Sequence, residues 1–504
     1  MNDPVIRRHT PGRQINGWAD IVVIGTGAGG SMVTYEAARA GRDVLAIELG
    51  AWLDDADMTG REDEMIPRLY AEAGARSTSD RGINVLQGIG VGGSTLHNTN
   101  LCRRLPVAIR EHWEEHHNVR LDGFDDDAKD VETLLNVHPV PDDAVNTNNR
   151  VFERGMQQLG WRGGRLSHNR DARCQRSGLC ELGCPNDGKV NGRRLMSEAI
   201  RHGARVLTLA RVEELHHDGR NVHAVSGSLL CGETHRPVGR FRVSCRQVVM
   251  AGSATSSAAL FLHSRVPCRV PAGRTLRLHP GIAVMGLHDE LIEGFRGIPQ
   301  SVECTEFLDL RHGSDRRVWL VSGFAHPAGA AALLPSFGQT HHELMRHYAH
   351  ASCAIAMVHD ESCGTVRPGA GSRVHIDYRL NVSDQEQLVQ GVRQAVRLLL
   401  AGGAREVVVP LSRPVRVTCE DDLQRIDRQL LQRYRPALTA VHPMGTLPMG
   451  RVGRGVCDPT GRVHSMNNLW VADGSLFPTS IGGPPQLTIY TLARRVARAV
   501  VAST

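Results

Sequence analysis

Three glycines and one glutamate near the N-terminus have the spacing of a dinucleotide-binding turn. Gly25, Gly27 and Gly30 lie between the apolar run IVVI and a helix of small residues, and a second apolar run, VLAI, follows that helix. Glycines at this spacing allow a tight turn, a close approach of the backbone to a pyrophosphate, and close packing of helix on strand. Glu48 directly follows the second run, where a carboxylate can accept hydrogen bonds from an adenosine ribose. The pattern predicts a βαβ unit that binds a dinucleotide, but it does not separate FAD from NAD.

Cys174, Cys180 and Cys184 are a second group whose spacing could do chemistry, because five and three residues separate them and Pro185 follows directly. Three thiolates are enough for a three-iron cluster, and the C-x-x-x-C-P end is typical of ferredoxin-like iron–sulfur sites. A zinc site with His168 as the fourth ligand is a second interpretation. Unligated or partly disulfide-linked cysteines are a third, so the residues alone leave the metal open.

The composition of the 504-residue chain is that of an ordinary globular protein. Hydrophobic residues make up 41% and charged residues 22%, which excludes disordered, collagen-like and coiled-coil proteins. The formal net charge is only +6 and no long basic block occurs, so we expect no nucleic-acid partner. No apolar run is long enough for a transmembrane segment, and prolines flank Arg7 and Arg8 where an export signal needs an apolar stretch. Twelve cysteines are too few for a disulfide scaffold, and we therefore expect a cytoplasmic protein.

The stretch from residue 374 to residue 404 has the pattern of a strand followed by a helix. Ser383 and Glu386 have the spacing of a capping box at the start of that helix. An apolar stripe on one helix face follows, formed by Leu388, Val392, Ala395, Val396 and Leu399. No motif in this region names a ligand.

Residues 84 to 105, NVLQGIGVGGSTLHNTNLCRRL, resemble the first signature of the glucose-methanol-choline (GMC) oxidoreductases. The matching residues are Gly92, Gly93, Ser94 and Asn98. In that family the segment lies along the pyrophosphate and the flavin ring, where glycines leave the backbone open to the cofactor. The resemblance therefore implies that the dinucleotide is FAD.

The C-terminal region is similar to the same family over a longer stretch. The segment AVHPMGTLPMG places His442 at the family's principal active-site histidine, and WVADGS places Asp473 and Gly474 at a second contact with FAD. A final helix from about Pro485, with Gln486 next, would point its N-terminus at the flavin, where its partial positive charge favours a reduced flavin.

Two further segments also resemble the family. LARVEEL places Val212 on the adenine side of the cofactor, and VVMAGSATSSAALFLHS is similar to the second signature. Ser257 stands in that signature where the family usually has proline. The resemblance covers nearly the whole chain and is densest at its two ends.

Pro484 is a departure from the family at the second catalytic position, where a histidine or an asparagine is usual. Proline has no side-chain donor or acceptor and no backbone N–H. A histidine from elsewhere, a water or the Gln486 amide could replace the missing group, or the chemistry is not ordinary alcohol oxidation. Proline could also serve to organise the start of the helix.

These features predict an α/β protein with a Rossmann-like FAD-binding domain of discontinuous segments and a substrate domain whose antiparallel sheet is flanked by helices. The predicted FAD-binding domain comprises residues 15–275, with a cysteine-containing loop at 165–195, and residues 431–504, whereas the predicted substrate domain comprises residues 276–430.

The resemblance implies an enzyme, a dehydrogenase or an oxidase, that oxidises the CH–OH group of a small-molecule alcohol by hydride transfer to flavin. His442 would be the general base, because a neutral imidazole can take the hydroxyl proton, and oxygen or a redox partner protein would reoxidise the flavin. A non-redox lyase or isomerase with structural FAD is one alternative, motivated by Pro484. Another is an iron–sulfur dehydrogenase subunit that passes electrons to a cytochrome, because the three cysteines also resemble the cysteine segment of such GMC subunits.

Overall fold

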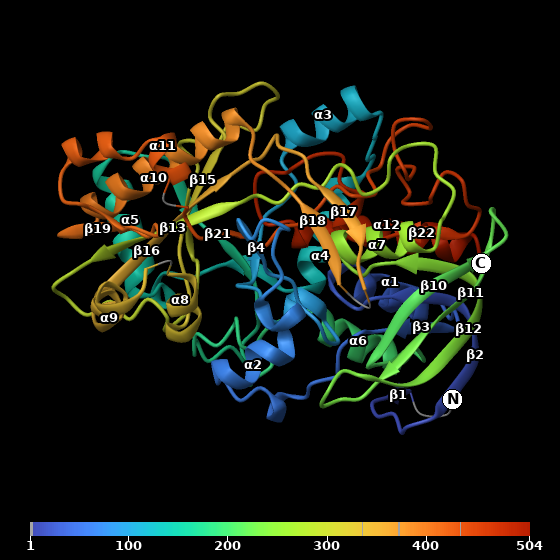
Figure 1. Ribbon diagram of the computed structural model, residues 1–504. Coiled ribbons are helices and arrows are strands. Elements are labelled where there is room, and N and C mark those ends of the chain that lie inside the picture. Colours follow the sequence, from blue (N-terminus) through green and yellow to red (C-terminus); the bar gives the residue numbers. More distant parts are fainter. Residues whose placement is uncertain (1–3, 335, 371–372, 434) are drawn as a thin grey trace.

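The first sheet of the protein contains the predicted βαβ unit. The computed structural model describes residues 4–334, 336–370, 373–433 and 435–504, and Figure 1 shows how their helices and strands are arranged. The strand order is β1-β9-β3-β2-β12-β11-β10, with β22 paired to β12. The pairs from β1 to β12 and the pair β12–β22 are parallel, whereas β10, β11 and β12 pair antiparallel. The strand bounds are β1 (Val5–Ile6), β2 (Arg13–Ile24), β3 (Val44–Ile47), β9 (Arg205–Leu207), β10 (Ala210–His217), β11 (Val222–Leu230), β12 (Pro237–Met250) and β22 (Leu469–Val471).

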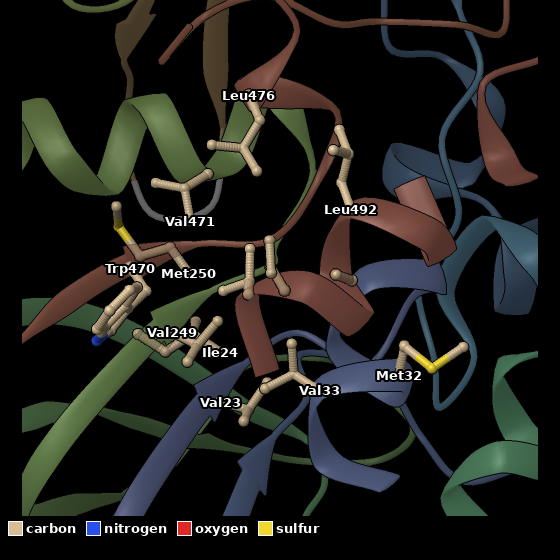
Figure 2. Close-up of a cluster of buried hydrophobic side chains, with 14 of the residues drawn as sticks. Val23, Ile24, Met32, Val33, Val249, Met250, Trp470, Val471, Leu476 and Leu492 are labelled. Carbon is tan, nitrogen blue, oxygen red and sulfur yellow. The ribbon is translucent and has the colours of Figure 1, made fainter. Parts of the chain in front are cut away.

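Four helices from different parts of the chain, including both of its ends, surround this sheet. The helices are α1 (Ala28–Arg39), α6 (Gly192–Arg201), α7 (Ala254–His263) and α12 (Gln486–Ala502), and α1 packs against both α6 and α12. Figure 2 shows Val23 of β2, Val33 of α1, Val249 of β12 and Val471 of β22 in one cluster of buried side chains. This shared apolar core holds the C-terminal segment against the N-terminal βαβ unit.

The second sheet is largely antiparallel and has the strand order β20-β19-β13-β16-β15-β14-β7. Strand β21 also pairs with β13, and β4 pairs with β21. Two helices, α5 (Thr147–Gln158) and α10 (Val382–Ala401), pack on it. The strand bounds are β4 (Ile83–Val85), β7 (Gly163–Arg165), β13 (Gly281–Leu287), β14 (Val302–Cys304), β15 (Val318–Ser322), β16 (Ala351–Val358), β19 (Glu406–Val409), β20 (Val415–Val417) and β21 (Leu438–Ala440). Strands β4, β7 and β21 come from outside residues 276–430, so this layer also draws on both flanking segments. The domain boundaries given above stay a prediction.

Shorter elements surround the two sheets. The remaining helices are α2 (Glu62–Leu69), α3 (Val107–His117), α4 (Phe124–Leu134), α8 (Pro327–Leu333), α9 (Gly338–Arg346) and α11 (Arg428–Arg433). Small sheets are formed by β5 (Leu101–Cys102), β6 (Val137–Pro139) and β8 (Ser167–Asn169), and by β17 (Thr365–Pro368) and β18 (Val374–Asp377). Within the described residues, no helix has both the length and the apolar character needed to cross a membrane.

Helix α10 confirms the predicted helix and its apolar stripe, but the predicted cap was wrong. The side chain of Asn381 accepts a hydrogen bond from the backbone N–H of Asp384, so the helix begins before Ser383. Asparagine caps a helix at least as well as serine, and here it comes first in the chain. The buried stripe residues are Leu388, Val392, Ala395, Val396 and Leu399, as predicted.

Asp384, in the first turn of α10, is fully buried and joins several segments of the second layer. One of its oxygens accepts a hydrogen bond from Arg317 at 2.5 Å, and the other accepts the backbone N–H groups of Glu361 and Ser362. Removing this carboxylate would take from the buried guanidinium of Arg317 its only buried charge partner among the described residues and leave it the half-exposed carboxylate of Glu361 at 3.5 Å, which is costly in a medium of low polarity.

We therefore expect Asp384→Ala to lower the free energy of unfolding by roughly 3–5 kcal/mol. Chemical denaturation of the variant and the wild type measures this difference. Asp289→Ala is the matched control, because Asp289 is 84% exposed in its ion pair with Arg405 and its loss should cost less than about 1 kcal/mol. Equal effects of the two substitutions would contradict the role of Asp384.

Candidate active site

A cavity of about 900 Å³ extends from the loops at the ends of the first sheet to the face of the second. The predicted site residues that line it are Gly25, Gly27, Glu48, Gly93, Ser94, Asn98, Val212, His442, Asp473, Gly474, Pro485 and Gln486. The other predicted site residues, all within the part of the chain that the structure describes, do not line the cavity; they are Gly30, Gly92, Cys174, Cys180 and Cys184. Segments far apart in the sequence thus meet around one space.

Two glycine-rich loops meet backbone to backbone in the wall of this cavity. A Cβ on Gly93 would lie 2.8 Å from the Cα of Gly27, and a Cβ on Gly25 would lie 2.5 Å from the carbonyl oxygen of Ala251. A Cβ on Gly30 would lie 1.9 Å from the carbonyl oxygen of Gly25, so Gly30 serves helix–strand packing. The N-terminus of α1, at Ala28, lines the cavity beside these loops. A wall without side chains next to open helix amides fits a bound pyrophosphate.

Glu48 holds three loops of this wall together. Its Oε2 accepts hydrogen bonds from the N–H and the hydroxyl of Thr26, and its Oε1 accepts the N–H groups of Gly50 and Gly90. Burial raises the pKa of Glu48, and these hydrogen bonds oppose that shift. Binding of a ribose by Glu48 stays a prediction.

Asp473 organises the C-terminal side of the cavity in a similar way. Its Oδ2 accepts hydrogen bonds from the backbone N–H of Ser253 at 2.9 Å and from the hydroxyl of Ser257 at 2.6 Å, while its Oδ1 accepts the N–H of Ser475. Ser257, which stands where the related proteins usually have proline, therefore anchors this carboxylate. Burial raises the pKa of Asp473.

The Gln486 amide is engaged at both ends at the start of α12. Its Oε1 accepts a hydrogen bond from Asn98 Nδ2 at 2.8 Å, and its Nε2 donates to the carbonyl oxygen of Leu101 at 2.7 Å. The buried Lys189 supports the same loop, because its Nζ donates to the carbonyl oxygens of Asn98 and Leu96. Gln486 thus holds Asn98 in place, and its catalytic role stays a prediction.

His442 lies on the loop after β21 and is the predicted base. It lines the cavity, and its Nδ1 is buried without a hydrogen-bond partner among the described residues, so Nε2 is the nitrogen on the cavity side. Burial, and then the neighbouring His279, hold the pKa of His442 well below its usual value. A neutral imidazole with its free lone pair toward the cavity can accept a proton there.

Two buried histidines near the cavity were not predicted as site residues. The ring of His279 stands perpendicular to that of His442, with 5.5 Å between centroids. His97 lines the cavity and packs on Tyr70, and burial lowers its pKa to about 3. The chain has 25 histidines, and no spacing in the sequence distinguishes these two from the rest.

The geometry around the three clustered cysteines gives no support to the metal site that their spacing suggested. Among the residues that the structure describes, no three His, Cys, Asp or Glu side chains are placed to hold a metal ion. Cys180 accepts a hydrogen bond from Asn100 at 3.7 Å and Cys184 accepts one from the N–H of Gly188 at 3.2 Å, so each thiol has its own neighbour. Cys174, Cys180 and Cys184 are free thiols. The iron–sulfur and zinc interpretations, and the cytochrome-coupled subunit that depended on a cluster, therefore have no support in this geometry.

The far end of the cavity is apolar. Strands β13, β15 and β16 and helix α8 turn hydrocarbon and aromatic side chains toward it, namely Ala283, Met285, Trp319, Ala330, Leu333, Ile355 and Met357. An apolar wall of this kind binds hydrocarbon through the hydrophobic effect.

The comparisons with known proteins identify the class of enzyme. Models of the GMC oxidoreductase family match residues 66–281 and 360–493. A GMC-type oxidoreductase of Mycobacterium tuberculosis, described as uncharacterized, is 32% identical over 500 residues, which cover 96% of this chain and 76% of that protein. The chain belongs to the GMC oxidoreductase family, and it is an FAD-dependent enzyme that oxidises CH–OH groups.

More distant relatives share the same architecture. The long-chain-alcohol oxidase FAO3 of Arabidopsis thaliana is 25% identical over 522 residues, which cover 95% of this chain and 68% of that protein. Among solved structures, pyridoxine 4-oxidase from Mesorbium loti has a TM-score of 0.68 at 18% identity and covers 95% of this chain and 99% of that one. A variant of the formate oxidase of Aspergillus oryzae has a TM-score of 0.73 at 15% identity, with 98% and 99% covered. The structural likenesses show the fold.

Gly27→Ala and Gly30→Ala should have different effects, the first on cofactor binding and the second on stability. Gly27 has an ordinary φ of −64°, and a Cβ there would come no closer than 4.0 Å to the Cα of Gly93, so Gly27→Ala should fold. The new methyl group would obstruct the pyrophosphate, and we expect the affinity for FAD to fall on the order of tenfold or more. Gly30→Ala should instead destabilise the protein, because its Cβ would clash with the carbonyl oxygen of Gly25.

Flavin titration and thermal unfolding of the two variants test this expectation. Unchanged flavin affinity in Gly27→Ala would contradict the placement of the pyrophosphate. A thermal midpoint of Gly30→Ala equal to that of the wild type would contradict the packing role of Gly30.

Proposed function

We propose that the protein oxidises the primary alcohol group of an apolar substrate to an aldehyde, with His442 as the general base. The observation that carries the proposal is that His442 is buried, has a lowered pKa and lies in the wall of a cavity whose far end is apolar. The bound FAD supplies the two-electron acceptor for the hydride that leaves the alcohol carbon. His442 Nε2 takes the hydroxyl proton, which makes that carbon a better hydride donor.

The rest of the site positions the reactants. Gln486 and Lys189 hold the loop of Asn98. The N-termini of α1 and α12, whose first residues line the cavity, favour negative charge on the cofactor. Burial of His442 lowers its pKa and so favours the neutral imidazole.

Two findings support an apolar alcohol as the substrate. The side chains that β13, β15 and β16 turn toward the cavity are mostly hydrocarbon, with Ser352 and Cys353 of β16 as the polar exceptions on these strands. The Arabidopsis thaliana relatives named long-chain-alcohol oxidases align over 95% or more of this chain. Because those relatives are oxidases, we propose oxygen as the final electron acceptor, with hydrogen peroxide as the second product.

Anaerobic mixing of the holoenzyme with a series of alcohols tests the reaction. We expect long-chain primary alcohols such as decanol to bleach the flavin absorbance and glucose to leave it unchanged. Admission of air should restore the oxidised spectrum and release peroxide. A flavin that no alcohol reduces would overturn the proposal and favour a lyase or isomerase.

Replacing the base gives a direct measure of its role. His442→Asn should lower the rate constant of flavin reduction on the order of 10²–10⁴-fold, because a positioned base contributes about that much. His464→Gln is the control, since His464 is half-buried and binds a backbone carbonyl, that of Gly450, away from the cavity. Comparable rates in the wild type and His442→Asn, at equal flavin content, would remove His442 from the mechanism.

The pH dependence of the same rate constant reports the protonation of His442. The reaction needs neutral imidazole, and the pKa of His442 lies well below the ordinary value of 6.5. As the pH falls through 6.5, the reduction rate should therefore stay constant and should decline only at lower pH. An acid limb centred near 6.5 would mean that His442 titrates as an exposed histidine does.

A further inference from the structure

What orients the ring of His442 is not a hydrogen bond at its Nδ1, because that atom is buried without a partner among the described residues. Pro484, which stands where the resembling family usually has a histidine or an asparagine, offers neither donor nor acceptor. The Gln486 amide is already bound to Asn98 and to the carbonyl oxygen of Leu101. The group that orients His442 must therefore come from another segment.

His279 occupies the place next to the base. It precedes β13, its side chain is fully buried, and its ring stands at 88° to that of His442 with 5.5 Å between centroids. His442 lines the cavity, and His279 is not among the described residues that do so. His279 therefore contacts the base from behind and does not face the substrate.

The hydrogen bond of His279 determines its tautomer. The backbone N–H of Gly482 donates to His279 Nε2 at 3.1 Å. A ring nitrogen that accepts a hydrogen bond has no proton, so the proton of the neutral ring is on Nδ1. That Nδ1 and the Nδ1 of His442 are both buried without a hydrogen-bond partner among the described residues. The two imidazoles can therefore orient one another through their edge-to-face ring contact.

One buried carboxylate joins His279 to the loop that contains Pro484. Asp360 Oδ2 accepts the backbone N–H of Leu278 at 2.8 Å and the hydroxyl of Tyr378, and its Oδ1 accepts the hydroxyl of Ser480 at 2.7 Å. The residue before His279 and the segment that begins at Ser480 are thus tied to the same side chain. The hydrogen bond from Gly482 to His279 links these two segments a second time.

We propose that His279 is the positioning residue for His442 and that it orients the ring by contact from behind. This proposal rests on the function proposed for His442. His279 moves no proton in the reaction: it keeps the His442 ring in the orientation that presents Nε2 to the cavity.

The groups around this pair also determine its titration. His359 lies with its ring centroid 6.1 Å from that of His279, and Asp360 Oδ1 lies 4.0 Å from His279 Nε2. Burial, and then the positive charges of Arg277 and Arg103, lower the pKa of His279 to about 3. His279 in turn lowers the pKa of His442. Loss of the His279 imidazole should therefore raise the pKa of His442.

The test compares His279→Phe, His279→Gln and the control His464→Gln as holoenzymes. In His279→Phe a ring of similar size remains but the nitrogens are lost. We expect its flavin-reduction rate to fall about tenfold or more, with KM and flavin content little changed, because only the orientation of the base is lost. His279→Gln can still accept the N–H of Gly482 and should keep the loop while losing the ring contact, so its rate should fall as well.

A second measurement is independent of turnover. Diethyl pyrocarbonate modifies neutral imidazole, and mass spectrometry of the peptide that contains His442 gives the pH midpoint of its modification. The midpoint should lie at higher pH in His279→Phe and His279→Gln than in the wild type, and His464→Gln should match the wild type.

Each outcome decides the proposal. An unchanged flavin-reduction rate and an unchanged pH midpoint of His442 modification in both variants would overturn it. A slower flavin-reduction rate with reduced flavin content and an unchanged pH midpoint would also overturn it, because that result is expected of a merely structural residue. If His279→Phe does not fold, the same two readouts on His279→Gln decide. His442→Asn separates this inference from the proposed function: if that variant still reduces flavin at the wild-type rate, the function fails, whereas an impaired His442→Asn beside normal His279 variants means that only the role of His279 fails.

Discussion

The contact between the two glycine-rich loops is the constraint on which the site depends. A Cβ on Gly93 would lie only 2.8 Å from the Cα of Gly27, and the cavity wall at that point is bare backbone. Glu48 keeps the loops in this position, because it binds Thr26 on one side and Gly50 and Gly90 on the other. The polar face of a nucleotide cofactor can then meet peptide N–H groups directly, without side chains in between.

The opposite end of the cavity follows a different physical rule. There the second sheet supplies apolar side chains, and burial makes charge unfavourable. Burial also lowers the pKa of His442, so the apolar substrate that we propose and the neutral state of the base have a common cause. Placing the base between a polar cofactor wall and an apolar substrate wall gives each part of the reaction its own environment.

Local sequence patterns predicted some elements of this protein correctly and others incorrectly. The βαβ unit, the final helix and the helix after residue 381 form where local patterns predicted them, because periodicity and turn residues act over short distances. The cap of α10 was misjudged, since Asn381 and Ser383 are both good capping residues and only the folded chain selects one. The cysteine spacing suggested a metal, but the loop turns Cys180 and Cys184 toward different neighbours. Spacing along a chain without a regular helix or strand says little about where side chains point.

By itself the sequence determined the class of fold, the nucleotide turn and the family, because these reside in contiguous motifs such as the glycines from Gly25 to Gly30 and the segment around His442. Only the tertiary structure decided which distant residues meet. It brought His279 beside His442 and Ser257 beneath Asp473, and it engaged both ends of Gln486. Such contacts depend on how two sheets and their loops pack, and a pairing between remote segments leaves no periodic trace in a single sequence.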